Sequence, residues 1–128
     1  MKITAKLLRQ LRFCPNQVAL VRERWPNGLG VNKRSIAKAS RIGLDLGEFA
    51  EHVLLWPALE EYLDRVYWEE EKYEESLDSY RMGVLSAKGA AAAMREYNGS
   101  IASFLVVLLA DPANIRPEVH EIIEEGRK

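Results

Sequence analysis

The sequence predicts an all-α protein in which a small N-terminal four-helix module packs on a longer antiparallel helical hairpin. Residues 56–84 place apolar side chains at alternating steps of four and three, which keeps them on one face of a helix. Proline, glycine and capping residues divide the first 55 residues into short helical segments. A chain of 128 residues has the length of one domain, so residues 1–128 are expected to form a single domain.

Four short helices are predicted in the first 55 residues, which form the N-terminal helical module. The side chains of Thr4, Asn32 and Asp45 can accept backbone N–H groups and so cap the helices that follow them. Pro15 suits the first position of a helix, where no amide hydrogen is needed, and Gly43 suits a helix end. The four helices are expected at Thr4–Arg12, Pro15–Trp25, Lys33–Ile42 and Leu46–Leu55.

The hairpin is predicted to begin at Ala58, after the Trp-Pro pair at 56–57. Only Glu70 interrupts the apolar seam of its first helix. A straight helix from Ala58 to Ala110 would be about 80 Å long, too long for a domain of this size. Gly83, Gly89 and Gly99 interrupt the register, so we expect the chain to bend or break at one or more of these glycines and to fold back. The Asn-Gly-Ser segment 98–100 offers a helix end and a new cap. The seam residues are Leu59, Leu63, Val66, Tyr73, Leu77, Tyr80 and Val84.

Residues 101–109 are apolar on almost every side, and a helix of that kind must be buried all round. It is expected to be either the central helix of the bundle or a homodimer interface through Ile101, Leu105 and Leu108. An acidic helix should follow at Glu118–Glu125 and end at Gly126.

The small net charge of −1 conceals a strong asymmetry between the two parts of the chain. Residues 1–55 carry ten Lys or Arg against four acids, which gives +6. Residues 56–128 carry eight against fifteen, which gives −7. Such a polarity either neutralises itself inside the fold or attracts different partners to each part.

The sequence gives no support to a membrane or secreted protein. The apolar run 101–110 has about half the length that a transmembrane helix needs. The N-terminus is amphipathic and lacks a signal-peptide cleavage site, so a cytoplasmic location is expected.

Catalytic, cofactor and metal sites are not expected. Cys14 is the single cysteine, and neither His52 nor His120 has the Glu three residues before it that di-metal helical bundles use. No Ser-His-Asp set, nucleotide-binding loop or zinc spacing stands out. The sequence therefore predicts a non-enzymatic protein.

The strongest functional pattern is an acidic run, which holds nine carboxylates between Glu60 and Asp78 against Arg65 and Lys72. Aromatic side chains interrupt this run, and exposed aromatic residues are enriched at protein interfaces. Such a surface can imitate a nucleic acid backbone and occupy a basic groove on another protein, although acidic helix faces are more often simply solvated. The candidate protein-binding residues are Tyr62, Tyr67, Trp68, Glu70, Glu71, Glu74 and Glu75.

A second pattern is that of a helix-turn-helix across residues 35–54. The small and apolar residues around Gly43 fit the turn. The second helix carries acids and apolar groups, whereas a recognition helix needs Arg, Lys, Asn or Gln. The remaining basis for nucleic acid binding is non-specific phosphate contact by Arg34, Lys38 and Arg41.

Several motifs resemble those of small, uncharacterised phage and prophage proteins. The chain has Ile3, Thr4, Leu7, Leu8 and Leu11, then CPNQVAL at 14–20 and GLDL at 43–46. In the similar proteins this N-terminal helical module is followed by eleven-residue repeats of the type PALxAYEEA. PALEEYLDR at 57–65 and EKYEES at 71–76 resemble degenerate copies of that repeat, with Tyr62 and Tyr73 eleven residues apart. The resemblance implies a phage or prophage origin and no particular activity.

Three functional hypotheses follow. The leading one is a phage-derived protein that binds, and inhibits, a host or defence protein through the acidic aromatic residues. The second is a small DNA-binding protein that uses the basic helix-turn-helix-like face. The third is a structural protein that associates with itself through its apolar helix.

Overall fold

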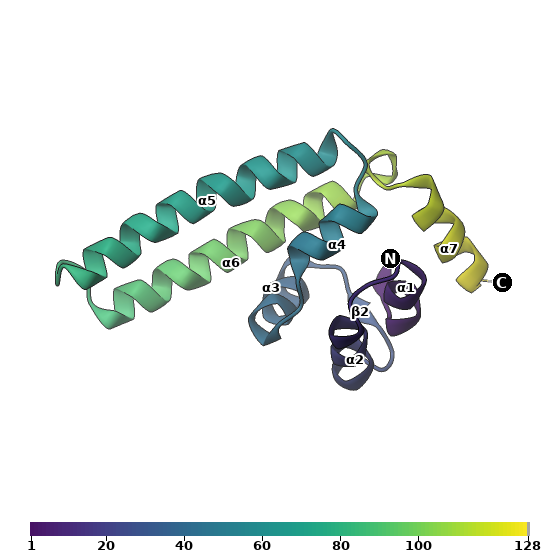
Figure 1. The fold of residues 1–128 in the computed structure, drawn as a ribbon, viewed down its shortest axis with the longest axis horizontal. Coiled ribbons are helices and arrows are strands. Elements are labelled where there is room, and N and C mark those ends of the chain that lie inside the picture. Colours follow the sequence, from purple (N-terminus) through teal and green to yellow (C-terminus); the bar gives the residue numbers. More distant parts are fainter. Residues whose placement is uncertain (128) are drawn as a thin grey trace.

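The computed structural model describes residues 1–127 and confirms the all-α class. Two long helices lie side by side and run in opposite directions, and the shorter helices gather at one end of this pair (Figure 1). The helices are α1 (Ala5–Gln10), α2 (Pro15–Arg24), α3 (Lys33–Ile42), α4 (Leu46–Val53), α5 (Ala58–Arg81), α6 (Ala87–Leu109) and α7 (Pro117–Arg127). The other elements are the strands β1 (Lys2–Ile3) and β2 (Leu29–Gly30) and a 3₁₀ turn at Pro112–Asn114.

Side-chain caps place the starts of three N-terminal helices where the sequence predicts them. The side-chain oxygens of Thr4, Asn32 and Asp45 each accept a backbone N–H three residues further on, at 2.9 to 3.0 Å. Gly43 ends α3 with a φ of 129°, a region that favours glycine. The capping residues predicted these helix starts correctly because each cap hydrogen bond forms within one helical turn and needs no tertiary contact.

The fold also contains a short antiparallel ladder that the sequence analysis did not predict. Lys2 pairs with Gly30, and Ile3 pairs with Leu29. The ladder buries the side chains of Ile3 and Leu29 almost completely. Two-residue strands carry no alternating pattern, so only the tertiary fold shows that these segments meet.

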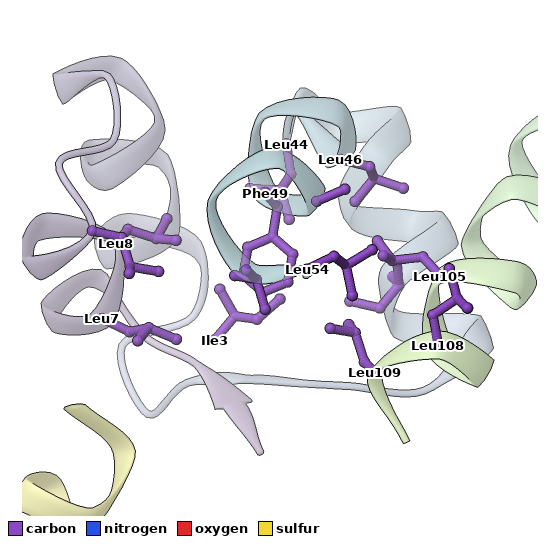
Figure 2. Packing of buried hydrophobic residues seen from close by; sticks show 14 of the residues in the cluster. Ile3, Leu7, Leu8, Leu44, Leu46, Phe49, Leu54, Leu105, Leu108 and Leu109 are labelled. Atoms are coloured by element: carbon purple, nitrogen blue, oxygen red, sulfur yellow. The ribbon is translucent and has the colours of Figure 1, made fainter. Parts of the chain in front are cut away.

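The core lies where the N-terminal helices meet the base of the long pair. Helix α3 packs along α6, and α4 contacts α5. Figure 2 shows Phe49 and Leu54 between Ile3 and the leucines of α6, and all of these side chains belong to one buried apolar cluster. Phe49 also contacts Phe13, with ring centroids 6.1 Å apart. The described part of this cluster runs over residues 3–62 and 101–119.

The long pair turns at Gly83, the first of the three glycines at which the sequence predicts a break, and not at residues 98–100. Helix α6 runs without interruption through residues 98–100, so the predicted break there is wrong. The chain reverses after Arg81 instead: Gly83 has a φ of 78°, and the Val84 N–H donates to the Ser79 carbonyl at 2.9 Å. The Ser86 hydroxyl then caps α6. A glycine in the left-handed conformation followed by a helix cap, as at Gly83 and Ser86, ends one helix and starts the next. The Asn-Gly pair at 98–99 fits inside α6 without a steric clash, so the helix continues through it.

The C-terminal segment is tied to the end of α4. Arg116 donates from Nε to the Leu54 carbonyl at 3.1 Å and from its guanidinium to the Glu51 carbonyl at 3.0 Å. These bonds satisfy carbonyls at the end of α4 that have no partner within the helix. Helix α7 then contacts α1, and it includes Gly126, so the predicted end at that residue is wrong.

Candidate functional site

The exposed side of α5 carries most of the predicted protein-binding residues. Tyr67 is 65% exposed and Trp68 is 53% exposed. The neighbouring carboxylates Glu71, Glu74 and Glu75 are also exposed. Residues 67, 71, 74 and 75 project from one side of the helix because they are three to four positions apart. We call these five residues the outer face.

The two aromatic residues of the outer face each lie beside a charged side chain. Lys72 Nζ lies 4.8 Å from the centroid of the Trp68 ring, close enough for a cation–π interaction. The Glu71 carboxylate raises the pKa of the Tyr67 hydroxyl, first by hydrogen bonding and then by its charge. Tyr67 is therefore a neutral phenol at pH 7.

Two of the seven predicted binding residues do not belong to this surface. Tyr62 is 2% exposed, so it does not belong to the outer face. Glu70 is exposed, but it turns toward α6, where it accepts a hydrogen bond from the Tyr97 hydroxyl at 3.3 Å. Both residues lie on the sides of α5 that face the rest of the molecule.

The acid that enters the helix interface is Glu69. It is 4% exposed and accepts a hydrogen bond from the Ser100 hydroxyl at 2.8 Å. Arg65, four residues earlier, lies 3.6 Å from the same carboxylate. The predicted seam, interrupted at Glu70, was therefore one residue out of register near its middle. An acid four residues after an arginine was the available signal for this pair.

The correct register also explains which predicted seam residues are exposed. Along the inner side of α5, the buried and half-buried residues include Leu59, Tyr62, Val66, Glu69, Tyr73, Ser76 and Leu77. Three residues of the predicted seam are exposed: Leu63, Tyr80 and Val84, with exposed fractions of 39%, 45% and 79%. Because the inner side includes Glu69, hydrophobicity alone could not locate it.

The predicted nucleic-acid-binding residues form a second surface on α3. Arg34, Lys38 and Arg41 are all exposed, and they follow one another at steps of four and three. No ion pair of the described residues involves any of the three. We call them the basic face. The following helix α4 buries Leu46, Phe49, Ala50 and Val53 in the core.

A groove between α3 and α6 holds further cations that the sequence analysis did not single out. It has a volume of about 680 Å³, and Lys33, Arg65 and Arg95 line it. The Arg65 guanidinium lies 4.8 Å from the centroid of the Phe104 ring, which also lines the groove. These cations come from three helices that are distant in sequence, so no local motif could have joined them.

The proposed homodimer residues are buried within the molecule itself. Ile101, Leu105 and Leu108 are 6%, 0% and 5% exposed, and they pack in the core. The structure therefore places these three side chains in the core of the molecule, which was the other position expected for this segment. Val107 is 63% exposed on the other side of α6. The sequence predicted that residues 101–109 are buried but did not show what packs against them. In the structure the N-terminal helices do so.

Within the part of the chain that the structure describes, no group of three or more His, Cys, Asp or Glu side chains could hold a metal ion. No helix among residues 1–127 is both long and apolar enough to cross a bilayer. Cys14 is exposed, and its backbone N–H donates to the Glu48 carboxylate at 3.0 Å.

Two surfaces of opposite charge therefore lie on separate helices, the outer face on α5 and the basic face on α3. In addition, Glu69 and Glu70 contact side chains of the hairpin itself, Ser100 and Tyr97, rather than the N-terminal helices. The chain was compared with protein-family models, with curated proteins and with solved structures, and none of the three comparisons found a match.

Proposed function

We propose that the protein is a non-enzymatic binding protein whose outer face docks on a basic surface of a partner protein. The observation that supports this proposal is the exposure of Tyr67 and Trp68 beside the acids of α5. Exposing a large aromatic side chain to water is unfavourable, and at interfaces such side chains often contribute much of the binding free energy. Carboxylates around them attract a basic partner and orient it.

A partner that normally binds nucleic acid would fit this surface best. Carboxylates repeated along one side of a helix present negative charge at regular intervals, as a phosphate backbone does. Occupation of the partner's groove would then inhibit it, in keeping with the phage origin that the N-terminal motifs imply. The interaction should weaken with salt, since the charges of the outer face are solvated.

The test is quantitative capture from a bacterial lysate, followed by binding measurements with the purified partner. The face variant carries Glu71→Lys, Glu74→Lys and Glu75→Lys. A matched control carries Glu121→Lys, Glu124→Lys and Glu125→Lys, three exposed acids of α7, and so has the same net charge. A true partner is retained by the control variant, is lost by the face variant and binds the Trp68→Ala variant at least tenfold more weakly.

Equal capture by the wild type and the face variant would refute the proposal. A partner lost equally from both charge variants would show a response to net charge and not to the outer face. Circular dichroism on both variants establishes that they retain the fold.

Nucleic acid binding through α3 is a second candidate function. It is favoured by the exposure of the three cations of the basic face, which have no ion pair among the described residues. Lys33 extends the charge into the groove beside α6. Such contacts would be made to phosphates and would carry no sequence specificity.

This second candidate is tested by the salt dependence of binding to a DNA duplex. Replacing the three cations of the basic face by Ala should reduce the slope of log K against log salt by about 2 to 3, if each neutralises one phosphate. The matched control replaces Lys6, Arg22 and Arg24, three exposed cations of α1 and α2. Equal slopes for the two variants would refute a role for the basic face.

A further inference from the structure

A cleft of about 310 Å³ lies between the α3–α4 turn and the long helices. Leu44, Leu63 and Ile101 are among its apolar lining residues, and Tyr62 and Tyr97 are its aromatic ones. We call it the tyrosine cleft. None of the residues of the outer face line it, so it is a separate feature of the molecule.

The buried Tyr62 side chain has a hydroxyl group that the fold leaves without a partner. Only 2% of this residue is exposed, yet none of the side-chain hydrogen bonds within residues 1–127 involves its hydroxyl. Buried tyrosine hydroxyls usually find a hydrogen-bond partner. No side-chain oxygen or nitrogen in that part of the chain is both unpaired and shielded from solvent, so the hydroxyl must open on the cleft. It can therefore bond a ligand there.

The charge of the tyrosine cleft is negative. Its charged lining residues among those described are Asp45 and Glu70, and no basic side chain lines it there. The Tyr97 hydroxyl donates to Glu70 and keeps its lone pairs for another donor. Burial, followed by the nearby Glu70 charge, raises the pKa of Tyr97 to about 12. Burial also raises the pKa of Tyr62. Both phenols are thus neutral at pH 7.

We propose that the tyrosine cleft binds an alkylammonium or guanidinium group. Carboxylates and phenol lone pairs accept the hydrogen bonds of such a cation, and aromatic rings attract it. The apolar wall suits the methylene stem that carries the charge. The volume is near the lower end for small-molecule sites, so one side-chain-sized ligand fits. Two sources share this chemistry: a Lys or Arg side chain of a peptide, and a free diamine.

The experiment is a titration of the full chain, followed by NMR of the tyrosine rings and by calorimetry. The cationic probes are Nα-acetyl-lysine methylamide, Nα-acetyl-arginine methylamide and cadaverine. The neutral probe is Nα-acetyl-norleucine methylamide, which has a similar apolar stem and no charge. At least one cationic probe should shift the Tyr62 and Tyr97 ring signals in a saturable way, and the norleucine probe should not.

Three variants assign the binding to the cleft. Tyr62→Phe removes only the unpaired hydroxyl and keeps the ring in the core. It should lower the affinity for the tightest-binding probe at least threefold. Glu70→Gln removes the charge at nearly constant shape and should lower the affinity for the same probe at least tenfold. Glu74→Gln removes an equal charge from the outer face and should leave binding within twofold of the wild type.

The outcomes separate the ligand sources and decide the proposal. Tighter binding of the amino acid derivatives indicates a peptide side chain, and tighter binding of cadaverine indicates a free amine. The proposal is overturned if no cationic probe binds, if the norleucine probe binds as well, or if Glu70→Gln and Glu74→Gln weaken binding equally. Because the outer face is intact in Tyr62→Phe and Glu70→Gln, failure here leaves the proposed docking function standing.

Discussion

The two ends of the α5–α6 pair are held together by different interactions. At the base, near the N-terminal helices, Leu59, Leu105 and Leu108 enter the apolar core. Toward the tip, between residues 63 and 100, Glu69 is the sole fully buried residue. The Tyr73 and Tyr97 rings, 5.4 Å apart, and other half-buried side chains hold the two helices there.

This difference indicates how the molecule divides stability and function. Local stability follows the number of buried apolar contacts, so the base should open only with global unfolding and the tip should open more easily. A two-helix extension without a third layer also leaves much of its surface exposed. The outer face lies on this two-helix extension. The core at the base holds the extension in place, and no other helix of residues 1–127 covers the outer face.

The largest difference is expected from truncations in the two regions. Phe49→Ala removes a fully buried ring at the base and should lower the free energy of unfolding by about 3 to 5 kcal/mol. Leu77→Ala, at a half-buried position near the tip, should cost about 1 kcal/mol because water can fill the space. Urea unfolding measures both. Similar losses would contradict the division into a base and a tip.

Glu69 should dominate the stability of the tip. Glu69→Ala leaves the Ser100 hydroxyl and Arg65 without their acceptor and should cost about 1 to 3 kcal/mol. The double variant Glu69→Leu/Ser100→Ala removes both polar partners and should be nearly neutral. Glu71→Ala, at an exposed position, is the control and should stay within about 0.5 kcal/mol. Hydrogen exchange of the α5 amides would localise the effect, and a loss shared by all three variants would refute it.

Two glycines test where the chain reverses. Gly83→Ala places a side chain at a φ of 78° and should destabilise the protein by about 1 kcal/mol. Gly99→Ala lies inside α6 with open space around the added methyl group, and it should stabilise by about 0.5 to 1 kcal/mol. Thermal unfolding of the pair should give shifts of opposite sign. Destabilisation by the Gly99 substitution would favour a break at residues 98–100.

A pH-dependent effect is also expected, namely alkaline destabilisation through Tyr97. Its pKa is about 12 in the folded protein and about 10 in the unfolded chain, so folding favours the protonated phenol. Its contribution is complete below pH 10 and is lost as the pH rises through 12. Tyr97→Phe should reduce the fall in stability between pH 10 and 12, as measured by denaturant unfolding. An unchanged fall would assign it to other groups.

The sequence was most informative about the N-terminal helices. Asn32 and Gly43 bracket α3 where predicted, because a cap and a left-handed glycine act within one turn of the chain. The sequence offered Gly83, Gly89 and Gly99 as breaks and did not single out Gly83, because the Asn-Gly-Ser segment at 98–100 gives a similar local signal. Only the packing of α6 on α3 and α5 shows that this second segment stays helical.

The candidate surfaces could be predicted only in part. The acids and aromatic residues of α5 were evident from composition, and a shift of one residue in helix register then decided which were exposed. Tyr62 turned inward with the core, and Glu69 replaced Glu70 at the helix interface. Periodicity places residues on a face to within about one position, which is too coarse to separate neighbours such as 69 and 70.

The sequence alone determined the helical class, the N-terminal helix starts and the segregation of charge, because these depend on local backbone chemistry and on residue counts. Tertiary structure decided which side of each helix is covered. It buried Ile101, Leu105 and Leu108 within the molecule, joined cations from three helices in one groove and brought Tyr62 and Tyr97 to one cleft. The physical reason is that burial depends on contacts between helices far apart in the chain, which local patterns do not encode.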